Sequence, residues 1–183
     1  LVYMALGLDK KYSIIYADPP WDYKGQKQHN TKNSNKSVED HYPTMKLDDL
    51  KKLNIKDITE DDCLLFMWTS SPHLEQAIEL GTEWSFKYIT IAFVWDKQKV
   101  NPSFYTMSQV EICLLFKKGK IPQPRGKRNI RQFISSCREK HSKKPDEVRD
   151  RIVEMFPIQN KIELFARQEY TGWDNFGNEI NKN

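Results

Sequence analysis

The sequence predicts an α/β fold in which helices cover both faces of a mainly parallel β-sheet. Short apolar runs rich in β-branched and aromatic residues recur along the chain, and segments with helical spacing lie between them. Strands that alternate with helices are joined by crossovers, so neighbouring strands run parallel. The length of 183 residues and the hydrophobic content of 38% are enough for one core, and we expect a single domain over residues 1–183.

Five segments have the composition of buried strands, and three have the spacing of helices. The expected strands are Ser13–Ala17, Cys63–Thr69, Tyr88–Trp95, Glu111–Phe116 and Ile162–Ala166. The expected helices are Leu47–Leu53, Pro72–Leu80 and Pro145–Met155. In the last of these, a first-turn proline followed by acidic residues is typical of a helix start.

Two polar segments fit neither pattern. Residues 24–37 (KGQKQHNTKNSNKS) are almost without apolar side chains and too long for an ordinary connection, which indicates an active-site loop or disorder. Residues 117–131 (KKGKIPQPRGKRNIR) carry seven basic residues and no acidic one, interrupted by glycines and prolines, and we interpret them as a basic loop.

Composition excludes several classes of protein. The three cysteines form no Cys-x-x-Cys pair and the four histidines lack metal-ligand spacing, so we expect reduced thiols and no metal. The longest apolar runs are too short for a membrane helix, and the start has no signal-peptide pattern. We therefore expect no membrane partner and a cytoplasmic location, or a nuclear one if the chain is eukaryotic.

The most informative segment is SIIYADPPW, in which a buried strand ends in Asp18, Pro19, Pro20 and Trp21. Ligands of open parallel sheets bind beyond the carboxyl ends of the strands, so Asp18 is expected at the mouth of the crevice. Its carboxylate can accept a hydrogen bond from an exocyclic amine, and consecutive prolines leave the Pro19 carbonyl free to accept a second one. Trp21 offers a flat face on which an extruded base can stack.

Each of these residues also has a purely structural interpretation. A strand-terminal aspartate can cap a turn, two prolines can end a strand, and a tryptophan is often a core anchor. Their occurrence in order after a buried strand favours a reaction centre at Asp18–Trp21.

Nearly the whole chain resembles the MT-A70-like family of adenine N6-methyltransferases, in its bacterial or phage form. The motifs that carry the resemblance are ADPPW, EDHYPTM, LLFMWTSSPHL, EICLLFKKGK, HSKKPDEV, IELFARQEYTGW and FGNE. Lys143 stands where some members have histidine, and Phe176 where many have tryptophan.

The resemblance implies a Rossmann-like fold that binds S-adenosylmethionine (SAM) and releases S-adenosylhomocysteine. It places Asp18–Trp21 at the target amine and the methionine end of SAM, with Asp18 binding the cofactor as well. It also implies that Lys144 contacts the cofactor carboxylate, that Arg167 lies near the ribose, and that Asn178 and Glu179 hold the ribose hydroxyls. From the residues alone, Arg167 can equally pair with Glu163 or Glu169, and the other three can be plain polar surface.

Lysine and arginine give sequence-independent affinity for phosphates, so we expect the two polar segments to clamp a nucleic acid. Both follow, in sequence, elements of the proposed reaction centre or core, although charged runs are often plain solvated faces. The basic loop contributes Lys117, Lys118, Lys120, Arg125, Lys127, Arg128 and Arg131. The polar loop contributes Lys24, Lys27, Lys32 and Lys36.

The sequence thus predicts a SAM-dependent methyltransferase that acts on the N6 amine of adenine in DNA. An RNA substrate and a catalytically inactive nucleic-acid-binding subunit are the alternatives. The resemblance makes a homodimer or a paralogous partner plausible. A nicotinamide dehydrogenase is disfavoured because no Gly-x-Gly-x-x-Gly follows a predicted strand.

Overall fold

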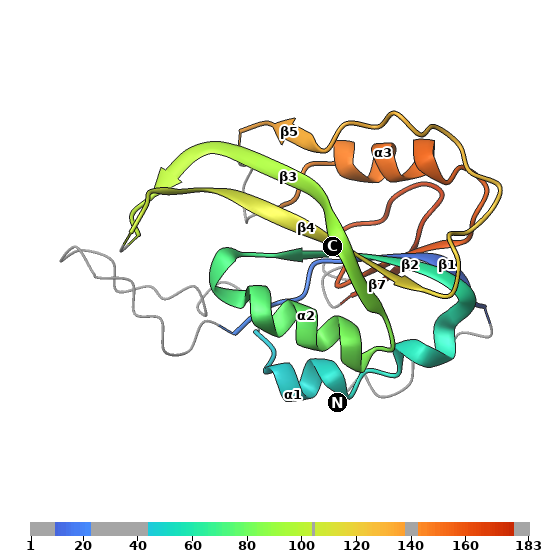
Figure 1. Ribbon diagram of the computed structural model, residues 1–183. Helices are drawn as coiled ribbons and strands as arrows, with labels where there is room; N and C mark the ends of the chain where they lie inside the picture. Colours follow the sequence, from blue (N-terminus) through green and yellow to red (C-terminus); the bar gives the residue numbers. More distant parts are fainter. Residues whose placement is uncertain (1–9, 23–43, 104, 138–142, 178–183) are drawn as a thin grey trace.

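The computed structural model describes residues 10–22, 44–103, 105–137 and 143–177, which build a seven-stranded sheet of order β5-β3-β4-β2-β1-β6-β7 (Figure 1). The strands are β1 (Tyr12–Ala17), β2 (Thr59–Thr69), β3 (Lys87–Asn101), β4 (Ser108–Lys118), β5 (Phe133–Ser135), β6 (Lys161–Leu164) and β7 (Asp174–Phe176). The helices are α1 (Leu47–Lys51), α2 (Leu74–Glu83) and α3 (Glu147–Met155), with 3-10 turns η3 (Ile55–Ile58) and η4 (Ser71–His73).

The sheet is mainly parallel, as predicted. Strand β1 lies between β2 and β6 and runs parallel to both, and the pairs β6–β7 and β3–β5 are also parallel. Only β4 departs from this rule, because it runs antiparallel to both β2 and β3. Strands β3 and β4 therefore form a hairpin rather than a crossover unit. The direction of β4 determines at which edge of the sheet the basic loop, residues 117–131, begins.

Helices cover both faces of the sheet, as Figure 1 shows with α1 and α2 on one side and α3 on the other. Successive side chains of a strand point to opposite faces. Ile15 and Ala17 of β1 accordingly pack in the cluster that contains Leu50 of α1 and Leu80 of α2. Their neighbours Ile14 and Tyr16 pack in the cluster that contains Val148 and Ile152 of α3.

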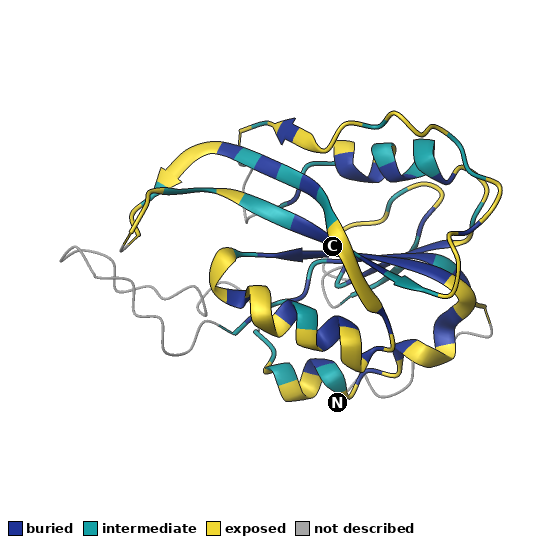
Figure 2. Ribbon diagram, in the orientation of Figure 1, coloured by how far each residue is buried: buried dark blue, intermediate teal, exposed yellow. Residues whose placement is uncertain are grey.

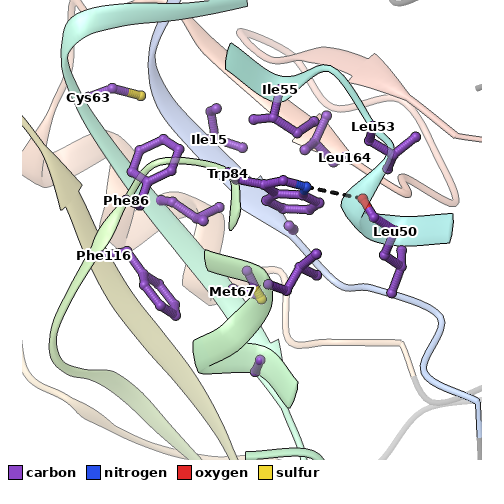
Figure 3. Packing of buried hydrophobic residues seen from close by; sticks show 14 of the residues in the cluster. Ile15, Leu50, Leu53, Ile55, Cys63, Met67, Trp84, Phe86, Phe116 and Leu164 are labelled. Atoms are coloured by element: carbon purple, nitrogen blue, oxygen red, sulfur yellow. Dashed lines mark hydrogen bonds between the residues drawn. The ribbon is translucent and has the colours of Figure 1, made fainter. Parts of the chain in front are cut away.

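Trp84 anchors the face covered by α1 and α2 (Figure 3). Its indole is buried, and its Nε1 donates a hydrogen bond of 3.1 Å to the carbonyl of Leu50, which joins the end of α2 to α1. Gly81 lets α2 approach the sheet, since a Cβ there would lie 2.3 Å from the ring of Phe116. This packing fixes α2 against the strands that carry the site.

The predicted elements differ from the observed ones mainly at their ends. Pro72 lies in the 3-10 turn η4, so α2 begins two residues later at Leu74. Strands β3 and β4 extend well beyond the predicted apolar runs into exposed residues, as the ends of the hairpin in Figure 2 show. Strands β5 and β7 have three residues each and were not predicted, because so short a segment has no measurable periodicity. No helix in the described part of the chain is long and apolar enough to cross a membrane.

Candidate active site

Asp18 lies at the carboxyl edge of the sheet. The last residue of β1, Ala17, pairs with Met67 of β2 and with Leu164 of β6, so the central strand and both parallel neighbours end at the same edge. The next residue is Asp18, whose side chain is 18% exposed. This is the position at which open parallel sheets bind their ligands.

A chain of alternating charges extends from Asp18 across this edge. The Nζ of Lys144, which lies just before α3, is 3.2 Å from Asp18 Oδ2 and 3.0 Å from Glu111 Oε2. The other oxygen of Glu111 is 3.3 Å from the Nζ of Lys97 on β3. Four segments, the turn after β1, β3, β4 and the residues before α3, therefore contribute to one largely buried network, in which every charge faces an opposite one.

The network sets the protonation of its buried members. Burial alone would raise the pKa of Glu111, but the ammonium groups of Lys144 and Lys97 hold that pKa below its ordinary value. Burial alone would lower the pKa of Lys144, and the Asp18 and Glu111 carboxylates raise it above its ordinary value instead. Glu111 is therefore a carboxylate and Lys144 an ammonium at neutral pH.

The ammonium of Lys144 also contacts an aromatic ring. Its Nζ sits 5.7 Å from the centroid of the Trp68 ring, within the range of a cation–π contact. The Nε1 of Trp68 donates a 2.6 Å hydrogen bond to the hydroxyl of Tyr16, whose pKa is raised by burial. The ammonium of Lys144 is thus bound by two carboxylates and by the indole of Trp68.

The two prolines form a tight turn rather than an extended segment. The Trp21 N–H donates a 2.9 Å hydrogen bond to the Pro19 carbonyl, and the Met45 N–H donates one of 2.8 Å to the Pro20 carbonyl. Our expectation that the Pro19 carbonyl is free was wrong, because the fixed φ of Pro20 suits a three-residue turn. A carbonyl oxygen has two lone pairs, so one acceptor position remains.

Trp21 is a core residue in this structure. Its side chain is 6% exposed, and its Nε1 donates a 3.2 Å hydrogen bond to the Trp68 carbonyl. One face stacks on His73, with centroids 5.7 Å apart and planes inclined by 16°. The indole therefore anchors the turn, and stacking of a base on its remaining surface stays a prediction.

His73 is a site-adjacent residue that sequence reasoning missed. Besides Trp21, it contacts Ser70 Oγ at 2.9 Å and the Asp22 carbonyl at 3.4 Å, and its pKa is lowered by burial. The signal was its place in LLFMWTSSPHL, directly after the strand that pairs with β1. It ties the beginning of α2 to the turn after Asp18.

The chain after β6 contacts the chain at the end of β7, and these are the parts that lead into the residues expected to hold a ribose. Phe165 has a φ of 62°, which redirects the chain, and the Ala166 N–H donates a 3.2 Å hydrogen bond to the Phe176 carbonyl. A Cβ on Gly177 would lie 2.2 Å from the Ala166 carbonyl oxygen, so only glycine allows this approach. Arg167 is half-buried next to this contact, and Asn178 and Glu179 lie outside the described residues.

Glu163, one of the two carboxylates considered as partners of Arg167, is bound by another arginine. Glu163 is buried and pairs with Arg149 of α3, whose Nε lies 2.7 Å from Glu163 Oε2. The guanidinium of Arg149 also lies over the rings of Tyr16 and Tyr170, at 5.3 Å and 5.0 Å. The carboxylate proposed as a possible partner of Arg167 is therefore already held by a different arginine.

The basic loop begins at the edge of the sheet opposite to the clamp that we expected. Lys117 pairs with Leu64 and Lys118 with Cys63, at the amino-terminal part of β2, whereas Asp18 lies beyond the pair Ala17–Met67. The reason is the antiparallel direction of β4, which delivers its carboxyl end to the opposite edge. Sequence proximity to a core strand did not indicate which edge.

The rest of the basic loop packs near the carboxyl end of α3. Lys127 forms an ion pair with Glu154, and the Arg125 guanidinium lies 5.7 Å from the Phe156 centroid. Lys144 precedes the other end of the same helix. Arg128 and Arg131 are exposed, and Lys24 and Lys27 lie outside the described residues. Nucleic-acid binding by these residues stays a prediction, but Lys117 and Lys118, where the loop begins, do not flank Asp18.

The chain is similar in sequence to a family of known proteins. The pattern of the MT-A70 family matches residues 12–179. The chain is 52% identical to the Type II methyltransferase M.MunI of a Mycoplasma species, over 95% of this chain and 80% of that protein. It is 30% identical to an N(6)-adenosine-methyltransferase MT-A70-like protein of Arabidopsis thaliana, over 93% of this chain but 24% of that protein. It is 28% identical to the human N(6)-adenosine-methyltransferase catalytic subunit METTL3, over 97% of this chain and 30% of that protein.

Proposed function

This chain belongs to the MT-A70 family, and from that premise we propose that it is a SAM-dependent methyltransferase acting on the N6 amine of adenine in DNA. The observation that carries the proposal is the Asp18–Lys144 pair at the carboxyl edge of the sheet, in the ADPPW and KKPDE motifs. Methyltransferase relatives cover nearly the whole chain, so the enzyme class rests on more than one motif.

The residues present fit the amino-acid end of SAM. That end carries one ammonium and one carboxylate, and the site offers the opposite pair, the Asp18 carboxylate and the Lys144 ammonium, in a largely buried position. Charge-assisted hydrogen bonds of this kind are roughly twice as strong as neutral ones. Arg167, Asn178 and Glu179 are proposed to hold the ribose. The contact between Ala166, which precedes Arg167, and Gly177, which precedes Asn178 in sequence, supports this proposal.

SAM supplies a methyl group that is already activated on a sulfonium sulfur, so the protein has to orient the acceptor rather than provide a strong base. The adenine amine is a weak nucleophile because its lone pair is delocalised into the ring. Asp18 accepts a hydrogen bond from this amine and localises electron density on its nitrogen. The second lone pair of the Pro19 carbonyl accepts the other amine hydrogen, and the turn fixed by Trp21 and His73 holds both acceptors in place.

The choice of DNA rests on the Mycoplasma relative, a Type II methyltransferase that the chain matches over most of its length. The plant and human relatives are named as adenosine methyltransferases, and the chain spans at most 30% of their length. RNA is therefore the second substrate to test.

Transfer of label from SAM separately to single-stranded DNA, duplex DNA and RNA, followed by nucleoside analysis, tests this function. We expect N6-methyladenine in DNA. Label on cytosine, or SAM binding without transfer to any of the three, would contradict the proposal. Label in RNA alone would assign the enzyme to the other substrate.

A further inference from the structure

Strands β3 and β4 continue past the rest of the sheet as a two-stranded ribbon, the β3–β4 arm, which comprises residues 97–110. The last pair between β2 and β4 joins Thr69 to Ile112, and β5 pairs with β3 only over Val94, Trp95 and Asp96. Beyond these residues no other described strand pairs with β3 or β4, although Gln98 still contacts Ser135 and Cys137. Figure 1 shows the arm reaching away from the helices.

The arm projects from the same edge of the sheet as Asp18. Residues of β4 before Ile112 lie beyond the carboxyl end of β2, the strand whose parallel neighbour β1 ends at Asp18. Contacts confirm the position, because Lys97 at the base of the arm binds Glu111, which binds Lys144, which binds Asp18. A ligand bound at the base of the arm is therefore next to the reaction centre.

Asp96 holds the base of the arm in a fixed orientation. Its carboxylate accepts hydrogen bonds from the Gln98 N–H at 2.9 Å, the Gln109 Nε2 at 2.7 Å and the Ser135 hydroxyl at 3.2 Å. Gln98 has a φ of 54°, and the ladder is irregular between Asp96 and Asn101. Such a bulge bends a ribbon, so the hydrogen bonds set the direction of the arm.

The arm has the chemistry of a polyanion-binding surface. Its sequence, KQKVNPSFYTMSQV, holds two lysines and no acidic residue, and its other polar side chains are amides and hydroxyls. Lys97 is buried in its ion pair with Glu111, so Lys99 is the lysine that the arm exposes. Tyr105 is 98% exposed and Met107 58% exposed, and Lys99 is exposed between them and the base. Amide and hydroxyl groups bind base edges and phosphates, and lysine binds phosphates.

We propose that the β3–β4 arm is the element with which this protein grips and reads duplex DNA beside the reaction centre. The inference rests on the proposed function, and it gives a target-contacting surface at the edge of Asp18, whereas Lys117 and Lys118 of the basic loop lie at the opposite edge. A major groove about 12 Å wide admits a two-stranded β-ribbon. A second protein chain is the other candidate occupant, and the exposed Lys99, in an arm that holds no acidic residue, favours the polyanion.

Two charge reversals on the same strand provide a matched test. Lys99→Glu alters the arm, and Lys87→Glu alters the exposed start of β3, which pairs with Lys117 at the opposite edge. Tyr105→Ala and Ile158→Ala form a second pair, since Ile158 is 70% exposed but lies after α3. Anisotropy of a labelled duplex at several salt concentrations gives affinity and salt slope. Calorimetry with SAM and sedimentation velocity show that the site and the oligomeric state are intact.

We expect Lys99→Glu and Tyr105→Ala to weaken duplex binding about tenfold, with SAM binding unchanged, and Lys99→Glu to reduce the salt slope by about 1 to 2. The two control variants should bind as the wild type does. Wild-type affinity in both arm variants overturns the proposal. A change in oligomeric state with unchanged duplex affinity also overturns it and assigns the arm to a protein partner. If the wild type methylates DNA in either case, the proposed function stands; if it transfers to no nucleic acid, that function fails independently of the arm.

Discussion

The Nζ of Lys144 lies 3.2 Å from a carboxylate oxygen of Asp18, so the segment before α3 and the turn after β1 form one site. Lys144 has a second role in the network, because it also binds Glu111. The consequences of this pairing can be measured.

Lys144→Met removes the ammonium and keeps the length of the side chain. We expect SAM affinity to fall at least about tenfold, about 1.4 kcal/mol, because the cofactor carboxylate loses its partner. Titration calorimetry with SAM measures the change. Lys143→Met is the matched control, since the neighbouring Lys143 pairs with Asp146 at the surface. An equal loss in both variants would remove Lys144 from the cofactor site.

Glu111 is expected to contribute to stability in a pH-dependent way. Its pKa in the folded state lies below the ordinary value of 4.5, so its ion pairs stabilise the protein above that pH. The stabilisation is lost as the pH falls from 4.5 through the folded-state pKa. Urea unfolding between neutral pH and pH values below 4.5 should therefore show a shallower acid loss for Glu111→Gln than for the wild type. Glu79→Gln, which alters an exposed pair with Lys51, should keep the wild-type slope.

Gly177→Ala is expected to weaken SAM binding about tenfold by separating the two chain segments after β6 and β7. The added Cβ would lie 2.2 Å from a backbone oxygen of Ala166, and backbone cannot move aside as a side chain can. Gly172→Ala is the contrast, since it has a φ of 82° but no heavy atom within 4 Å of the added Cβ. It should cost about 1 kcal/mol of stability and leave SAM affinity intact, as calorimetry and urea unfolding would show. Equal SAM affinity in all three proteins would mean that the Ala166–Gly177 contact does not shape the site.

Arg149→Met leaves the buried Glu163 carboxylate without its arginine. Removal of one partner of a buried pair costs about 3–5 kcal/mol, which urea unfolding would detect. Replacing Glu163 with Met as well should recover most of that loss, because no unpaired charge then remains. A double variant as unstable as the single one would show that packing of Arg149 between Tyr16 and Tyr170, rather than its charge, stabilises the fold.

The sequence predicted the elements whose side chains are buried on a regular period, and with them the position of Asp18. It did not indicate the direction of β4, because apolar periodicity is the same in parallel and antiparallel strands. Because the direction of β4 was not predicted, Lys117 and Lys118 were expected near Asp18. The arm was not predicted either, because its exposed residues show no apolar periodicity. The contacts of Glu111 and His73 join segments far apart in sequence, so no local spacing gave their partners, although the motif LLFMWTSSPHL put His73 after a core strand.

The most direct test of the role of Asp18 is methyl transfer by the Asp18→Asn variant in a single turnover. The substrate is unmethylated duplex DNA that contains a site at which the wild-type enzyme transfers a methyl group. The amide keeps the shape of the side chain but lacks the negative charge that polarises the amine. We expect the rate of N6-methyladenine formation to fall at least about a hundredfold, about 2.7 kcal/mol, while the variant remains folded. A rate within a few-fold of the wild type would contradict the assignment of Asp18 as the residue that activates the adenine amine.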